Sequence, residues 1–230
     1  MNPDNVVYQV AAWVIPLIIA IVFHEVAHGY VAYLLGDRTA QRLGRLTLNP
    51  IRHVDPIGTV VLPLVLALAH APIFGWAKPV PVIASRMRNP QLDMALVAMA
   101  GPASNLVLGF VAALGVALVS RAAGAELPET GVTYFLLLNL YNFLQINIFL
   151  SIFNMLPLPP FDGGHVVAAV LPKSLAAPYA QLGRYGFLIM LGLLVILPTI
   201  APGADVVAQI IGPVADGVRR LFLGVAGLLV

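Results

Sequence analysis

The amino-acid sequence predicts an all-α polytopic membrane protein. Of its 230 residues, 60% are hydrophobic and only 10% are charged, whereas soluble domains carry about 25% charged residues. The mean hydropathy is +0.94, and several apolar runs reach the roughly 20 residues that a helix needs to cross a bilayer. The apolar runs continue to the C-terminus, which excludes a single secretory signal peptide. The formal net charge of +2 indicates no nucleic-acid partner, and the lipid bilayer is the expected surrounding.

The apolar runs define the expected elements in chain order. The first run covers about residues 6–35 and is closed by Gly36, a typical helix C-cap. The later runs span about residues 57–74, 92–119, 132–156 and 185–200. We therefore expect about four to six transmembrane helices.

The short run over residues 57–74 is predicted to be a re-entrant hairpin. Seven of the twelve basic residues lie in the two segments that flank it, and the positive-inside rule puts both segments on the cytoplasmic side. The alternative is a plain short transmembrane helix. The stretch "GWAKPVPV" that follows predicts a short extended edge segment, because Pro79 and Pro81 cannot donate ladder hydrogen bonds.

The stretch "FHEVAHGY" places His24, Glu25 and His28 inside the first apolar run. On a helix the two histidines lie on one face, one turn apart. In the HExxH pattern two imidazoles bind one zinc ion, and the glutamate reaches the water molecule beside it. The alternative is two core histidines bonded to backbone carbonyls, with Glu25 paired to an arginine. Ionisable residues at membrane depth are costly and mark function, which favours the metal site.

A catalytic zinc site takes three protein ligands, and the chain has no cysteine. Asp162 is the favoured third ligand, because the proline-rich stretch before it breaks the preceding helix at membrane depth. Non-helical backbone at that depth lines a cavity or is buried in protein, and Gly163 and Gly164 permit a tight turn there. An interfacial turn with Asp162 as a helix N-cap is the alternative. The other candidate ligands are His53, Asp55, His70, Glu126 and His165.

The number of membrane crossings between the first helix and Asp162 bears on the path of residues 57–74. The two histidines lie about 10–16 Å below the end of the first helix, and Asp162 can meet them only if the chain crosses an even number of times in between. The runs over 92–119 and 132–156 supply two crossings. A third crossing by residues 57–74 would put Asp162 on the wrong face, so this argument also favours the re-entrant hairpin.

The sequence resembles the site-two protease family of intramembrane zinc metalloproteases. The resemblance rests on "HEVAHG" (24–29), "GPASN" (101–105) and "NMLPLPPFDGG" (154–164), and with "GWAKPVPV" it extends over about residues 23–164. It implies that His24, His28 and Asp162 bind one zinc ion per chain and that Glu25 is the catalytic base. The chain looks like a minimal member without PDZ or CBS domains.

The expected organisation is a single membrane-embedded peptidase domain over residues 1–230. Its catalytic core covers about residues 6–171, and C-terminal helices cover about 175–230. We expect a prokaryotic cytoplasmic membrane location, with the active site nearer the cytoplasmic face. The oligomeric state stays open.

The expected reaction is hydrolysis of a peptide bond in or near a transmembrane segment of a membrane-protein substrate. The extended edge segment is expected to take the unwound substrate by β-augmentation. Asn154 either binds the substrate and its oxyanion or forms a helix-to-helix hydrogen bond. Asn105, a second candidate for substrate binding, lies among small residues that favour close helix packing, and the favoured role is a bond across that contact. The alternative function is a non-proteolytic metal-binding or zinc-transporting membrane protein.

Overall fold

The computed structural model describes residues 5–68, 75–124, 130–201, 205 and 207–230, and in these ranges it contains helices and loops but no β-strand. Four helical segments of the described chain are long and apolar enough to span a membrane: Val7–Leu34, Pro90–Ala123, Gly131–Asn154 and Ser174–Ile200. The predicted class, an all-α multi-pass membrane protein, is therefore confirmed.

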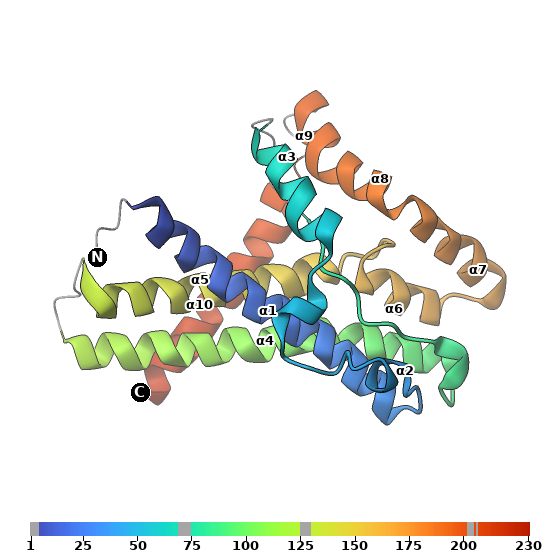
Figure 1. Ribbon diagram of the computed structural model, residues 1–230, viewed down its shortest axis with the longest axis horizontal. Coiled ribbons are helices and arrows are strands. Elements are labelled where there is room, and N and C mark those ends of the chain that lie inside the picture. The colour runs from blue at the N-terminus through green and yellow to red at the C-terminus, as the bar shows by residue number, and fades with distance from the viewer. Residues whose placement is uncertain (1–4, 69–74, 125–129, 202–204, 206) are drawn as a thin grey trace.

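Three long helices, α1 (Val6–Leu34), α4 (Pro90–Ala123) and α5 (Gly131–Asn154), pack together as the core (Figure 1). The Asn5 side chain caps the start of α1 by accepting the Val7 N–H at 2.8 Å. Pro90 begins α4 at a position where its missing N–H costs nothing. Helices α4 and α5 run antiparallel and return the chain to the end at which α1 finishes.

Small side chains hold these helices close. Ala112 and Ala113 of α4 pack against Leu144 and Ile148 of α5 in a buried cluster. Lipid tails are as apolar as leucine, so close van der Waals packing rather than hydrophobic burial stabilises such contacts. Helix α10 (Gly212–Leu229) joins the same cluster through Ala226, and its Phe222 ring stacks edge-to-face on Phe110 at 5.5 Å.

The flanks of the 57–74 run meet at one end of the bundle. The Asp37 carboxylate accepts backbone N–H groups of Thr39 at 3.0 Å and of Ile83 at 2.6 Å, and Arg86 donates to the Thr39 hydroxyl at 2.6 Å. Between these flanks lie η2 (Pro56–Val61) and α3 (Leu62–Leu68), six and seven residues long. Both flanks therefore lie at the same end of the bundle, as the charge pattern predicted, while residues 69–74 of the predicted hairpin lie outside the described residues.

The predicted extended segment is present over residues 75–83, but one of its edges is already occupied. The N–H groups of Trp76, Lys78 and Val80 all point to one side, to Gly58 O at 3.2 Å, His53 O at 2.9 Å and Glu25 Oε2 at 2.7 Å. Intervening residues of an extended chain face the opposite side, and Pro79 and Pro81 stand there. The free edge therefore presents carbonyl oxygens with almost no N–H donor.

The remaining helices complete the chain. Short helical turns fill connections: α2 (Thr39–Arg42), η1 (Pro50–His53), η3 (Ala84–Arg86) and η6 (Val207–Ile211). After α6 (Asp162–Val170), a helical run stands away from the three-helix core in Figure 1 and comprises α7 (Lys173–Gln181), η4 (Leu182–Tyr185), α8 (Gly186–Leu191), η5 (Gly192–Ile196) and α9 (Leu197–Ile200). Phe187 of α8 stacks edge-to-face on Trp76 at 5.9 Å.

Replacing Asp37 should remove a pH-dependent part of the protein's stability. Burial alone raises the pKa of Asp37, but hydrogen bonds from the Thr39 hydroxyl and the Ile83 and Thr39 amides, with the charge of Arg86, hold it below its ordinary value. A lowered folded-state pKa contributes stability above the unfolded-state pKa, and this stability is lost as the pH falls through the folded-state value. We expect Asp37→Asn to cost about 1.5–3 kcal/mol at pH 7, measured by thermal unfolding in detergent. The difference from the native protein should shrink below pH ~4, and a difference independent of pH would contradict the assignment.

Candidate metal centre

His24 and His28 project from one face of α1 toward α4. Their side chains are buried, and the two imidazole rings meet edge-to-face with centroids 4.6 Å apart. The Nε2 atoms of the two rings are 3.0 Å apart. The predicted one-turn spacing thus aims both nitrogens at a single point.

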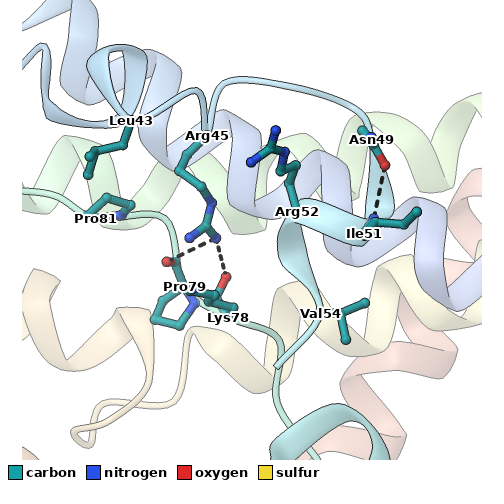
Figure 2. Close-up of a pocket in the computed structure, with 9 residues that line it drawn as sticks. All are labelled: Leu43, Arg45, Asn49, Ile51, Arg52, Val54, Lys78, Pro79 and Pro81. Carbon is teal, nitrogen blue, oxygen red and sulfur yellow. Dashed lines mark hydrogen bonds between the residues drawn. The ribbon is translucent and has the colours of Figure 1, made fainter. Parts of the chain in front are cut away.

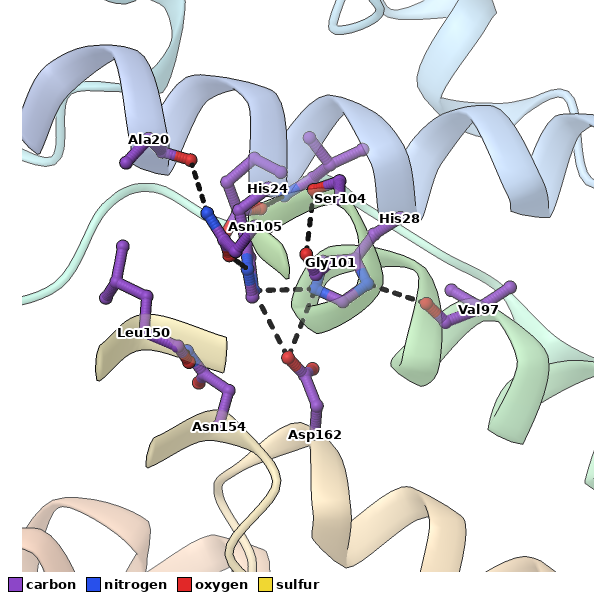
Figure 3. A network of polar contacts seen from close by, with 12 residues as sticks. Ala20, His24, His28, Val97, Gly101, Ser104, Asn105, Leu150, Asn154 and Asp162 are labelled. Atoms are coloured by element: carbon purple, nitrogen blue, oxygen red, sulfur yellow. Dashed lines mark hydrogen bonds and ion pairs between the residues drawn. The ribbon is translucent and has the colours of Figure 1, made fainter. Parts of the chain in front are cut away.

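Asp162 completes the cluster from the far side (Figure 3). It is the first residue of α6, and its Oδ2 lies 3.2 Å from His24 Nε2 and 3.3 Å from His28 Nε2. In the described part of the chain these three residues form the one group able to hold a metal ion. The structure therefore brings together the three residues that the sequence predicted as ligands.

Two glycines let α6 begin beside the end of α5. A Cβ atom on Gly163 would lie 2.4 Å from the carbonyl oxygens of Met155 and Leu156, and a Cβ atom on Gly164 would lie 2.7 Å from the Pro159 nitrogen. Only glycine permits such a close approach of two backbones. The predicted tight turn is present, and close packing of backbone against backbone is its cause.

The outer nitrogen of His24 bonds across to α4. Its Nδ1 lies 2.5 Å from Asn105 Oδ1, while Asn105 Nδ2 donates to Ala20 O at 3.3 Å and to Asn147 Oδ1 at 2.7 Å. Asn105 is fully buried with its amide engaged on both sides. This geometry favours the bond across the helix contact over the predicted substrate contact. Asn147 of α5, which sequence reasoning did not single out, positions Asn105; its only sequence signal is an amide inside an apolar helix.

The hydrogen bonds determine which ring nitrogens carry protons. His24 Nδ1 faces the Asn105 oxygen, and His28 Nδ1 faces the Val97 carbonyl at 2.7 Å. Both partners are acceptors, so we assign the proton of each neutral ring to Nδ1 and a lone pair to each Nε2. The Oδ2 atom of Asp162 is buried and makes no hydrogen bond. Three lone-pair atoms therefore face one another without a donor, and a cation is the group that relieves this repulsion.

The donor set and its spacing fit zinc. Two imidazole nitrogens and one carboxylate oxygen leave the fourth tetrahedral position open, as in catalytic zinc sites. Tetrahedral bonds of about 2.0–2.1 Å separate neighbouring ligand atoms by roughly 3.3 Å, close to the 3.0–3.3 Å separations in the cluster.

Glu25 and Asn154 flank the cluster. Glu25 is half-buried, and its Oε2 accepts the Val80 N–H at 2.7 Å. Asn154 ends α5 near Asp162 in Figure 3 and donates one N–H to Leu150 O of its own helix at 2.9 Å. No bond from Asn154 to another helix occurs among the described residues, so its amide oxygen and second N–H stay available.

The other predicted ligand candidates lie elsewhere. His53 is buried and bonds Thr47 O at 2.9 Å, and Asp55 caps η2. His165 is exposed and does not join the cluster. His70 and Glu126 lie outside the described residues.

An HExxH helix joined to an aspartate from a second helix, inside an apolar bundle, defines a multi-pass membrane protein with a metallopeptidase-type centre. The model of peptidase family M50 matches residues 121–197. YwhC of Bacillus subtilis, which carries the name of a zinc metalloprotease, is 39% identical over 212 residues, 91% of this chain and 90% of the relative. Rip2 of Mycolicibacterium smegmatis, similarly named, is 29% identical over 187 residues, 81% of this chain and 66% of the relative.

No solved structure gives a significant match. The chain belongs to peptidase family M50, the site-two protease family of metalloproteases. Membership in this family implies a zinc cofactor, which agrees with the donor set of His24, His28 and Asp162.

Gly101 of α4 provides the space that both imidazoles occupy. A Cβ atom at this position would lie 2.4 Å from His28 Nε2 and 2.6 Å from His24 Cε1. We expect Gly101→Ala to displace both rings and to weaken zinc affinity by at least about tenfold, measured by metal analysis of the purified protein. Gly109→Ala is the matched control on the same helix, because its Cβ would make only ordinary contacts at 3.5 Å. Full zinc content in Gly101→Ala would contradict the prediction that the two rings need the space at Gly101.

Proposed function

We propose that this protein hydrolyses a peptide bond in or near a transmembrane segment of a membrane-protein substrate. The carrying observation is the convergence of His24, His28 and Asp162 inside the helix bundle, with Glu25 next to the first ligand. The two histidines stand ten and six residues before the end of α1 at Leu34, about 15 and 9 Å along the helix axis. A centre at this depth can receive a substrate helix sideways from the lipid.

Each residue has a distinct part in the proposed reaction. His24, His28 and Asp162 would hold the metal, and zinc when bound supplies Lewis acidity that acidifies a water molecule and polarises a carbonyl group. Glu25 takes the proton from the attacking water and delivers it to the leaving amine. The Val80 N–H holds one carboxylate oxygen of Glu25 in place, and Oε1 has no hydrogen-bond partner among the described residues. That free oxygen serves for proton transfer.

The extended segment over residues 75–83 is the proposed site for the unwound substrate. Its free edge offers the carbonyls of Ala77 and Pro81, so a substrate strand would donate its own N–H groups there. The Pro79 carbonyl on the same edge already accepts from Arg45 at 3.3 Å. Asn154, with an N–H not engaged in the helix, would supply a donor to the substrate backbone or to the developing oxyanion. The extended segment contacts Glu25, and Asn154 lies near Asp162. These positions support the proposal that both bind the same substrate.

We further propose that the protein lies in a prokaryotic cytoplasmic membrane with the metal centre nearer the cytoplasmic face. Seven of the twelve basic residues lie in the two segments that meet at the end of the bundle where α1 finishes, which the positive-inside rule assigns to the cytoplasm, and the relatives come from bacteria.

Single cysteines can test this orientation, because the native chain has none. We expect Arg42→Cys and Arg88→Cys to react with an impermeant maleimide only after the cells are permeabilised. Thr130→Cys, beyond the opposite end of α4, should react in intact cells. Labelling of all three in intact cells, or the reverse pattern, would reject the orientation.

A substitution of Glu25 separates proteolysis from metal binding. We expect Glu25→Gln to retain zinc and to lower cleavage of a single-span substrate in liposomes by about 10²–10⁴-fold, because the proton acceptor is lost. His24→Ala should lose both zinc and cleavage. Asn154→Ala should keep its zinc while its turnover falls.

The same liposomes decide between the two functions. A zinc transporter would show zinc uptake into the vesicles and would cleave nothing. Undiminished cleavage by Glu25→Gln would falsify the proposed role of this residue.

A further inference from the structure

A separate cavity of about 920 Å³ lies between the loop after α2 and the extended segment (Figure 2). Its polar lining includes the cationic side chains Arg45, Arg52 and Lys78, and none of the lining residues is acidic. Exposed apolar residues line the same cavity: Leu43, Ile51 and Val54. The cavity therefore combines a concentrated positive charge with an apolar border.

Arg45 is a buried cation without an ion-pair partner in the described part of the chain. It is only 9% exposed, and its guanidinium Nη2 donates to the carbonyls of Lys78 at 2.8 Å and of Pro79 at 3.3 Å. Its Nε is buried without a partner, and no carboxylate of the described chain forms an ion pair with it. Neutral carbonyls do not cancel a buried charge, and buried charges are normally paired. The charge and burial of Arg45 therefore favour an anion as the ligand of this cavity.

The position of the cavity indicates where the anion comes from. Val80, next to the lining residue Pro79, bonds to Glu25 nine residues before the end of α1 at Leu34, about 14 Å along the axis. The lining residues Leu43 to Val54 follow the end of α1 at Leu34. The cavity therefore extends from the basic segment that the positive-inside rule assigns to the cytoplasmic side, where the lipid headgroups lie, toward the depth of Glu25.

We propose that this cavity binds the headgroup of an anionic phospholipid. The phosphate oxygens would contact Arg45, Arg52 and Lys78, and the acyl chains would run along Leu43, Ile51 and Val54. Basic pockets at the cytoplasmic side of membrane helices bind anionic headgroups in this way, and the apolar border favours a lipid over an acidic protein segment. The cavity lies apart from the metal cluster but shares Pro79 and Pro81 with the extended segment that is proposed to take the substrate. Binding of a lipid there goes beyond the proposed proteolysis and does not require it.

The bound lipid would also order the segment that holds Glu25. Arg45 fixes the carbonyls of Lys78 and Pro79, and the next residue, Val80, donates to Glu25. A headgroup bound to Arg45 would therefore influence the position of Glu25 through the backbone of Pro79 and Val80.

The test is thermal unfolding of the purified full-length protein in neutral detergent, titrated with dihexanoyl phosphatidylglycerol. We expect a saturable rise in Tm, because a ligand that binds only the folded state stabilises it by mass action. Arg52→Gln and Lys78→Gln should each weaken the apparent affinity about fivefold, as about 1 kcal/mol is lost per cation. The double variant should weaken it about 25-fold. Both side chains are exposed, so neither substitution threatens folding.

Matched controls and competing ligands make the result decisive. Arg42→Gln and Arg88→Gln remove the same charge from exposed positions outside the cavity and should leave the titration unchanged. Dihexanoyl phosphatidylcholine should give little shift. An equal shift with phosphatidylcholine or with inorganic phosphate would overturn the anionic-lipid assignment, and an equal shift with a soluble polyglutamate peptide would transfer the site to a protein ligand. A phosphatidylglycerol response that survives in the double variant would also overturn it.

Discussion

The mutual repulsion of three lone pairs is the constraint on which the centre of this molecule depends. His24, His28 and Asp162 hold their donor atoms 3.0–3.3 Å apart in the interior of a helix bundle, an arrangement that a bound metal ion would stabilise. Neighbouring features serve this contact. Asn105 and the Val97 carbonyl turn the imidazole lone pairs inward, Gly101 leaves room for both rings, and the glycines of α6 bring the carboxylate within reach.

The segment between α1 and α4 contacts Glu25 of α1 and is also the proposed binding site for the substrate. Glu25 belongs to the metal-binding helix, yet its carboxylate is held by a backbone N–H 55 residues later. The extended segment that donates this N–H is also the proposed platform for the substrate. A substrate strand bound to its free edge would therefore lie on the side of the segment opposite to the Val80 N–H that donates to Glu25. In the proposed function, the arrival of the substrate and the positioning of Glu25 would therefore both depend on this one segment.

The spacing of residues within segments and the number of membrane crossings were enough to predict the metal-binding residues and the main course of the chain. The HExxH period placed His24 and His28 on one face, the proline-rich break before Asp162 favoured that residue as the third ligand, and the count of crossings favoured the returning hairpin. Other features follow from contacts between helices distant in sequence, so no pattern in one segment announces them. Asn147 supports His24 only through Asn105, and Gly101 is a spacer only because α1 lies against it. The extended segment was expected, but the occupation of its inner edge depends on where the loop after α2 settles.

The partners of the two outer imidazole nitrogens have an electronic consequence. Many metal-bound histidines donate to a carboxylate, which passes negative charge through the ring and makes the ligand more basic. Here both acceptors are neutral: an asparagine amide and a backbone carbonyl. A zinc ion held by two neutral rings and one carboxylate would have a net charge of +1. Such an ion would keep much of its electron-withdrawing power, which would suit the proposed cleavage of an unreactive amide bond in apolar surroundings.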